Sequence, residues 1–158
     1  MTEKERVETK KLHIPRWTAP LGVLFSLLGI ADTIYLTIGH YTEHFSFACP
    51  TTSFVNCESV TTSSYSQILG IPVAVLGLTF FVAMLAFQLP QIWKLHSKLV
   101  LYARLAFSVS GIVVALWLIF VEFQKLHEIC LYCTASHILA FGIFVVTSIS
   151  TALIVQSE

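Results

Sequence analysis

Four separate stretches of this chain are long and apolar enough to cross a membrane, and they constrain its fold more than any other feature. They cover about residues 19–38, 72–89, 99–121 and 133–155. The hydrocarbon core of a bilayer is about 30 Å thick and requires roughly 20 apolar residues in a helix. Lipid offers the backbone no hydrogen bonds, so each stretch is predicted to be a helix. We therefore expect an all-α integral membrane protein whose core is a four-transmembrane-helix bundle.

The composition supports lipid as the main solvent of the chain. Of its 158 residues, 56% are hydrophobic and 11% are charged, and the mean hydropathy is +0.79. In soluble domains, about a quarter of all residues are charged. The formal net charge is zero, which gives no reason to expect nucleic acid as a partner. We expect one membrane domain at residues 18–155, a cytoplasmic N-terminal tail at 1–17 and a C-terminal tail at 156–158.

The distribution of lysine and arginine predicts the orientation of the bundle, because these residues concentrate on the cytoplasmic side of membrane proteins. Segment 41–71 contains none, and the connection between the last two stretches contains only Lys125. The remaining ones are Lys4, Arg6, Lys10, Lys11, Arg16, Lys94, Lys98 and Arg104. We predict a multi-pass cell-membrane protein with both termini in the cytoplasm. The first stretch is too long for a signal-peptide core and is expected to stay as an anchor.

All four cysteines fall on the outer side in this topology. Cys49 and Cys57 lie in the long outer loop, and Cys130 and Cys133 lie where the outer connection enters the fourth stretch. Cysteines that served only as small core hydrophobes would be scattered through the helices. A shared position in an oxidising compartment favours disulfides and redox chemistry instead.

Cys130 and Cys133 form a Cys-x-x-Cys motif at the start of a predicted helix. This spacing puts both sulfurs on one helix face, and the unpaired N–H groups at a helix N-terminus stabilise a thiolate. Such a pair can cycle between dithiol and disulfide. The same motif fits half of a zinc site, so zinc remains an alternative on spacing alone.

Cys49 and Cys57 enclose seven residues, more than the roughly two to four that separate paired zinc ligands. This spacing is comfortable for a loop disulfide, which would serve either as a redox pair or as a structural staple. A staple alone does not explain the second pair nearby.

A short helix is expected in the outer loop, beginning near Cys57. Asn56 is a suitable N-cap for it. The residues Val60, Ser64 and Ile68 then recur at helical spacing. This helix would lie across the mouth of the bundle, above the Cys-x-x-Cys motif.

Two neighbouring cysteine pairs suggest an electron relay. An external dithiol would reduce the loop disulfide, and the loop thiols would then reduce the pair on the fourth helix. Thiol–disulfide exchange only moves electrons among sulfur atoms, so the path needs a final acceptor. A quinone of the menaquinone or ubiquinone type is the natural acceptor, because quinones dissolve in the membrane at the depth of that pair.

Several runs of residues around the cysteines are distinctive. They are Val55-Asn56-Cys57-Glu58-Ser59-Val60, Ser63-Ser64-Tyr65-Ser66, Gly70-Ile71-Pro72-Val73-Ala74-Val75-Leu76-Gly77 and Cys130-Leu131-Tyr132-Cys133. Over about residues 18–155 the chain resembles the prokaryotic branch of the vitamin K epoxide reductase family. The resemblance implies a four-helix bundle with a quinone near the Cys-x-x-Cys motif. It also implies a loop pair that exchanges electrons with a thioredoxin-like partner.

The resemblance implies a role for each matched residue. Cys49 would meet the thiol of the partner, and Cys57 would exchange with Cys130. Cys133 would face the quinone. Ser63 matches the serine that lies near the site in this family. The implied function is a membrane thiol oxidoreductase that passes electrons to a quinone and supports disulfide bond formation.

Two features of this chain differ from those of some members of the family that it resembles. Some members carry a fused thioredoxin-like domain, whereas this sequence ends at Glu158, so we expect a separate thioredoxin-like protein as partner. In animal members a tyrosine that contacts the quinone lies four residues after the last cysteine, and His137 occupies that position here. His137 could donate a proton to a quinone oxygen or only pack against another helix. The departure favours protein disulfide formation over epoxide reduction.

Buried charge is the remaining signal. Asp32 lies inside the first stretch, where a charge costs about 3 kcal/mol by insertion scales. It lies too far along the bundle from Arg104 for a direct pair. We expect it to be protonated or bonded to Thr33, Thr37 or a neighbouring helix. Glu122 is interpreted as an ordinary polar loop residue.

Three other functions fit parts of the pattern. An outer-face zinc-binding or transport protein could use the four cysteines with His127 or His137, but their uneven spacing argues against it, and we predict no metal site. A structural adaptor could carry two inert disulfides. A second four-helix bacterial family also couples quinone to disulfide formation, but the residues around Cys57 fit it poorly.

Overall fold

The computed structural model of the chain describes residues 17–42, 45–89 and 98–156. The expected tails lie almost wholly outside this part of the chain, as do most of the lysines and arginines on which the predicted orientation rests. The proposed boundaries of the membrane domain therefore stay a prediction.

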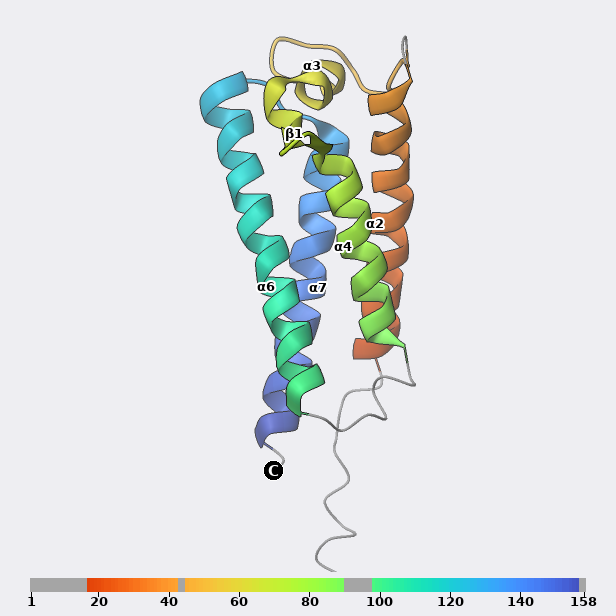
Figure 1. Cartoon of the computed structure of the whole chain (residues 1–158), viewed down its shortest axis with the longest axis vertical. Coiled ribbons are helices and arrows are strands. Elements are labelled where there is room, and N and C mark those ends of the chain that lie inside the picture. Colours follow the sequence, from red (N-terminus) through yellow and green to blue (C-terminus); the bar gives the residue numbers. More distant parts are fainter. Residues whose placement is uncertain (1–16, 43–44, 90–97, 157–158) are drawn as a thin grey trace, which may run out of the picture.

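Four helices run side by side along the long axis of the molecule (Figure 1). They are α2 (Thr18–Tyr41), α4 (Val73–Gln88), α6 (Lys98–Val121) and α7 (Leu131–Gln156). Within the described residues, the segments 18–41, 99–126 and 131–155 are long and apolar enough to cross a membrane. Large apolar side chains such as Leu27, Leu116 and Ile138 are exposed on their outer faces, as expected of helices that face lipid. The prediction of a helical membrane protein is confirmed.

The helix α4 is shorter than the second predicted stretch. It has 16 residues, which extend over roughly 24 Å against a hydrocarbon core of about 30 Å. Proline sets both of its ends. Pro72 pairs in a strand just before the helix, and Leu89 has extended backbone angles (φ −65°, ψ 139°) because the following Pro90 disfavours a helical conformation there.

The helices pack through small side chains. One stripe of α2 is buried against its neighbours and consists of Thr18, Gly22, Ser26, Gly29, Thr33, Leu36 and Gly39. A Cβ atom at Gly22 would lie 2.6 Å from Cδ of Gln88 on α4, so a larger residue there would require the Gln88 side chain to shift. The helix α2 packs along α4 and α7, and α7 also packs along α6, whereas α4 has few contacts with α6 and α7. A cavity lies between α4, α6 and α7.

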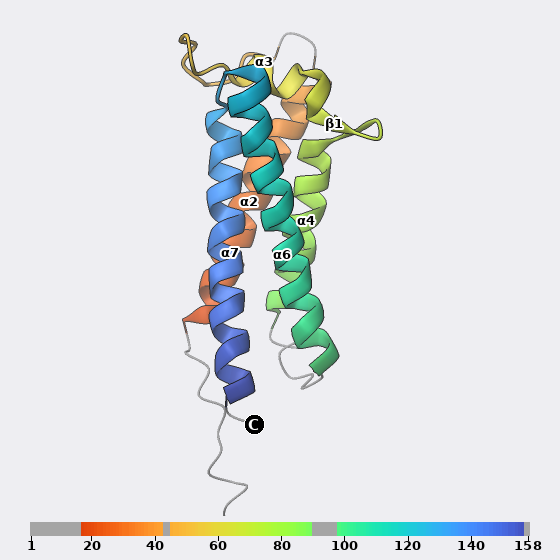
Figure 2. The same ribbon diagram turned by 90° about the vertical axis from the view of Figure 1, so that its left-hand side faces the viewer.

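The chain between α2 and α4 folds over one end of the bundle as a cap (Figure 1). It contains α3 (Cys57–Thr62), the 3₁₀ turn η1 (Ser64–Ser66) and the strands β1 (Gln67–Ile68) and β2 (Ile71–Pro72). The two strands form an antiparallel hairpin with Gln67 opposite Pro72 and Ile68 opposite Ile71. The hairpin projects sideways from the bundle (Figure 2). Its turn places Gly70 at φ 80°, a conformation that glycine adopts without strain.

The predicted outer-loop helix is present as α3. The side chain of Asn56 accepts a hydrogen bond of 3.1 Å from the backbone N–H of Ser59, which confirms the predicted N-cap. The helix ends at Thr62, earlier than the helical spacing indicated. Ser63 is extended (φ −61°, ψ 158°), and its hydroxyl donates to the carbonyl of Val60, so the chain turns away before Ile68.

A π-helical turn, η2 (Glu122–Leu126), continues α6 into the connection with α7. A π-helix has i→i+5 hydrogen bonds and occurs mostly as single turns. The left-handed conformation of His127 (φ 54°) ends the turn. This turn lies at the same end of the bundle as the cap.

Candidate redox site

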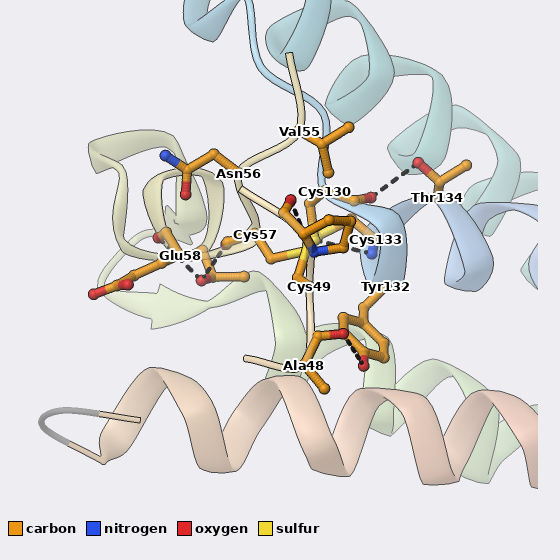
Figure 3. Close-up of a disulfide and its surroundings, with 12 residues drawn as sticks. Ala48, Cys49, Val55, Asn56, Cys57, Glu58, Cys130, Tyr132, Cys133 and Thr134 are labelled. Atoms are coloured by element: carbon orange, nitrogen blue, oxygen red, sulfur yellow. Dashed lines mark hydrogen bonds between the residues drawn. A yellow bond between two sulfur atoms is a disulfide. The ribbon is translucent and has the colours of Figure 1, made fainter. Parts of the chain in front are cut away.

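All four cysteines meet at the capped end of the bundle (Figure 3). Cys49 and Cys57 form a disulfide with a Cα–Cα distance of 6.2 Å. Cys130 and Cys133 are free thiols. The predicted loop disulfide and the predicted convergence of the two pairs are both found.

Backbone hydrogen bonds explain why these distant segments meet. Residue Ile129, just before Cys130, forms a parallel bridge with Val55. Its N–H donates to the carbonyl of Phe54 at 2.7 Å, and its carbonyl accepts from the N–H of Asn56 at 3.1 Å. The residues before Cys57 are thereby fixed beside those before Cys130.

The four sulfurs differ in burial. Cys57 and Cys130 are 1% and 0% exposed, and both belong to one buried cluster with Leu36 and Val60. Cys49 and Cys133 are half-buried and pack against the edge of that cluster. One cysteine of each pair is therefore enclosed, and these two enclosed cysteines share an environment.

The Cys-x-x-Cys motif has the expected position at the start of a helix. Cys130 directly precedes α7, and its carbonyl accepts from the N–H of Thr134 at 2.9 Å. The backbone N–H of Cys133 donates to Sγ of Cys130 at 3.1 Å. The first turn of α7 therefore supplies a hydrogen-bond donor to the sulfur of its own N-cap residue.

Two tyrosines hold the loop residue that precedes Cys49. The backbone N–H of Ala48 donates to the hydroxyl of Tyr35 on α2 at 3.0 Å. The hydroxyl of Tyr132, inside the Cys-x-x-Cys motif, donates to the carbonyl of Ala48 at 3.1 Å (Figure 3). The two rings lie 4.7 Å apart between centroids. Both polar groups of one loop residue are thus tied to two different helices.

The variant Tyr132→Phe is expected to make the Cys49–Cys57 disulfide easier to reduce without unfolding the protein. It removes the hydroxyl that donates to Ala48 and leaves the ring contact with Tyr35. We expect the equilibrium constant for forming Cys49–Cys57 in glutathione buffer to fall roughly two- to fivefold. The control Tyr102→Phe, at an exposed position on α6, should leave it unchanged. An unchanged constant in Tyr132→Phe would contradict a role for this hydrogen bond.

A cavity of about 430 Å³ lies below the cap, between the helices. Its wall is mainly apolar, and Cys133 faces it from the first turn of α7. Both further residues singled out in the sequence, Ser63 and His137, also line it. The Nδ1 atom of His137 is buried and has no hydrogen-bond partner among the described residues. The cavity therefore combines a thiol, an apolar wall and an unsatisfied polar atom, which is the pattern of a small-molecule site.

A comparison with models of known protein families assigns residues 20–148 to the vitamin K epoxide reductase family. This match extends over most of the chain. The protein belongs to the vitamin K epoxide reductase family. Membership makes it a membrane thiol oxidoreductase, and its apolar helices make it a multi-pass membrane protein. Members of the family use quinones and a redox partner.

In this vitamin K epoxide reductase family member, Asp32 is held by a neighbouring helix. Its carboxylate accepts a hydrogen bond from the hydroxyl of Ser136 on α7. Arg104 instead donates to Ser150 at 2.6 Å. Among the alternatives considered for Asp32, bonding to a neighbouring helix is confirmed. Because Ser136 lines the cavity, this pair contributes to its wall.

The interpretation of Glu122 as an ordinary loop residue is wrong. Its side chain is 4% exposed and lines the cavity, and its carboxyl accepts a hydrogen bond from the backbone N–H of Cys130. The reason is that the helical path continues past Val121 into η2, so Glu122 stays on the face of Ala115 and Leu118, which also line the cavity. The signal in the sequence was this helical spacing, which continues the predicted third helix through Glu122.

The zinc alternative requires several ligand side chains to lie together. Among the described residues, which include all four cysteines, no group of three or more histidine, cysteine, aspartate or glutamate side chains is arranged to hold a metal ion. Cys49 and Cys57 are bonded to each other and so are not metal ligands in this state.

Proposed function

We propose that the protein is a quinone-reducing thiol–disulfide oxidoreductase that supports disulfide bond formation. Electrons come from a separate thioredoxin-like protein and pass through Cys49 and Cys57 to Cys130 and Cys133. The final acceptor is a quinone of the menaquinone or ubiquinone type. The observation that supports this path most strongly is the graded burial of the four cysteines.

Burial favours Cys49 as the point of contact with the partner. Cys49 is half-buried, whereas Cys57 is 1% exposed. A thiolate of the partner therefore attacks Cys49, which breaks the Cys49–Cys57 bond and releases Cys57 as a thiolate. The second thiol of the partner then attacks the mixed disulfide. The partner leaves with a disulfide, and the loop pair has gained two electrons.

The shared buried cluster favours Cys57 and Cys130 as the contact between the pairs. When Cys130 and Cys133 are joined, the Cys57 thiolate attacks Cys130 and releases Cys133. Cys49 then attacks Cys57, which restores the loop disulfide and releases Cys130. The two electrons now reside on the Cys130 and Cys133 thiols, which matches the disulfide pattern of the structure.

The cavity suits a quinone as the final acceptor. A bound quinone supplies the capacity to take up two electrons and two protons. Cys133 passes the electrons from the edge of the cavity, and Cys130 then closes the disulfide. The apolar wall suits a ring of this kind. The buried Nδ1 of His137 is available for a hydrogen bond to a quinone oxygen, and Ser63 lines the side below the cap.

The proposed topology has four membrane-spanning helices, with the cysteine end outside the cell membrane and both termini in the cytoplasm. The cap and the α6–α7 connection share one end of the bundle (Figure 1). The helix α4 therefore returns the chain across the membrane before α6, although it is the shortest of the four. The lack of lysine and arginine in segment 41–71 supports the outer position of that end.

The proposed activity is tested by anaerobic mixing of purified protein in detergent with a reduced thioredoxin-like protein and a quinone. The change in quinone absorbance is followed with time. We expect multiple quinones to be reduced per protein molecule, with one partner disulfide formed for each quinone. Quinone that stays oxidised with both ubiquinone and menaquinone would rule out the proposed function.

A further inference from the structure

Glu122 is a buried carboxyl that the electron path does not use. It is 4% exposed and lines the same cavity as Cys133 and His137. It occupies the first position of the π-helical turn η2. Turns of this type occur frequently at functional sites.

The surroundings of Glu122 connect it with both cysteines of the Cys-x-x-Cys motif. Its carboxyl accepts a hydrogen bond from the backbone N–H of Cys130. It also lines the same cavity as Cys133. A neutral acceptor would be enough to satisfy the N–H of Cys130. Burying the ionisable carboxyl of Glu122 for this purpose alone is costly. The position therefore calls for a function beyond packing.

Other titratable side chains around the cavity are less suited to exchange a proton with these thiols. His40 is engaged by the carbonyl of Thr61 at 3.1 Å and by Gln67 at 3.4 Å. Asp32 is bonded to the hydroxyl of Ser136. The unsatisfied His137 lies on α7, a turn further along the helix than Cys133.

We propose that Glu122 is a catalytic proton carrier between the Cys-x-x-Cys thiols and the quinone in the cavity. This step rests on the proposed function. When Cys130 and Cys133 are oxidised, two S–H bonds break, one S–S bond forms, and two electrons and two protons leave. The quinone gains both electrons and both protons as two O–H bonds form. The carboxylate of Glu122 takes up a thiol proton and then donates it to a quinone oxygen.

The test compares Glu122→Gln, Glu122→Asp and Glu122→Leu in the full-length protein. Glutamine keeps an acceptor for the Cys130 N–H but cannot carry a proton, whereas aspartate keeps the carboxyl. Two rates are measured anaerobically for each variant: exchange between the partner and the cysteines without quinone, and quinone reduction. The control Glu128→Gln lies on the same connection, where its carboxylate accepts only a 3.4 Å hydrogen bond from Asn56 among the described contacts.

We expect Glu122→Gln to exchange with the partner at the wild-type rate and to reduce quinone at least about 100-fold more slowly. Glu122→Asp should recover part of this rate, Glu122→Leu should be as slow as Glu122→Gln, and Glu128→Gln should match wild type. Wild-type quinone reduction in Glu122→Gln would overturn the proposal, and so would an equal loss in both rates. A wild-type protein that fails to reduce quinone would instead refute the underlying function.

Discussion

Replacement of Cys133 by alanine is expected to abolish quinone reduction. The cavity places this sulfur, alone among the four, in contact with the space assigned to the quinone. Without it, the electrons that reach Cys130 have no sulfur from which to leave. We expect the turnover rate to fall by roughly three orders of magnitude or more, as when a nucleophile is removed from an enzyme. Quinone absorbance under anaerobic conditions measures this rate.

A matched control separates the loss of this sulfur from damage to the cavity. Thr79→Ala changes another residue of the cavity wall, whose hydroxyl bonds only to the Val75 carbonyl of its own helix among the described contacts. It should keep most of its activity. Both variants should unfold at temperatures close to that of wild type. A Cys133→Ala protein that retains more than about a tenth of wild-type turnover would contradict the assignment of Cys133.

The variant Cys49→Ala is expected to lose turnover with the protein partner but to keep turnover with a small membrane-permeant dithiol. The partner is too large to reach Cys57, which is 1% exposed, or Cys130, which is 0% exposed. A small dithiol reaches the Cys-x-x-Cys pair through the cavity that Cys133 lines. We expect partner-driven turnover to fall at least about 100-fold. Dithiol-driven turnover should fall much less, because Cys133 can attack the Cys57–Cys130 bond that forms without Cys49 and so restore the Cys130–Cys133 disulfide.

The comparison of the two reductants on one variant supplies its own control, because a misfolded protein would lose both activities. Partner-driven turnover at the wild-type rate would show that Cys49 is not the point of contact. Equal loss with both reductants would show that the loop pair acts on the Cys-x-x-Cys pair through structure rather than through electron transfer.

Much of the fold could be predicted because lipid leaves few alternatives. Long apolar stretches in lipid had to be helices, because only a helix pairs every backbone polar group within one segment. The bounds of all four helices agree with the predicted stretches to within three residues. The N-cap at Asn56 was equally predictable, since capping depends on a few neighbouring residues. The short length of α3 was not, because the extended conformation of Ser63 depends on how the chain turns into the hairpin.

In the candidate site, too, the features that depend on local spacing could be predicted, and those that depend on contacts between distant segments could not. The positions of Cys133 and His137 on the cavity side of α7 follow from helical spacing, which puts residues four apart on one face. The inward direction of Glu122 could have been predicted in the same way, because Glu122 lies seven residues after Ala115 and four after Leu118, which also line the cavity. The two hydrogen bonds that hold Ala48 depend on contacts among α2, α7 and the loop. Local spacing contains no information about such a meeting of three segments.

Electrons pass from Cys57 to Cys130 in the proposed path, and a double variant tests this contact most directly. Cys49→Ala combined with Cys133→Ala leaves only these two of the four cysteines. After mild oxidation in detergent, peptide mapping by mass spectrometry without reduction identifies any disulfide. We predict that most molecules contain an intramolecular Cys57–Cys130 bond. Two thiols that remain free, or bonds only between separate molecules, would contradict the proposed electron path.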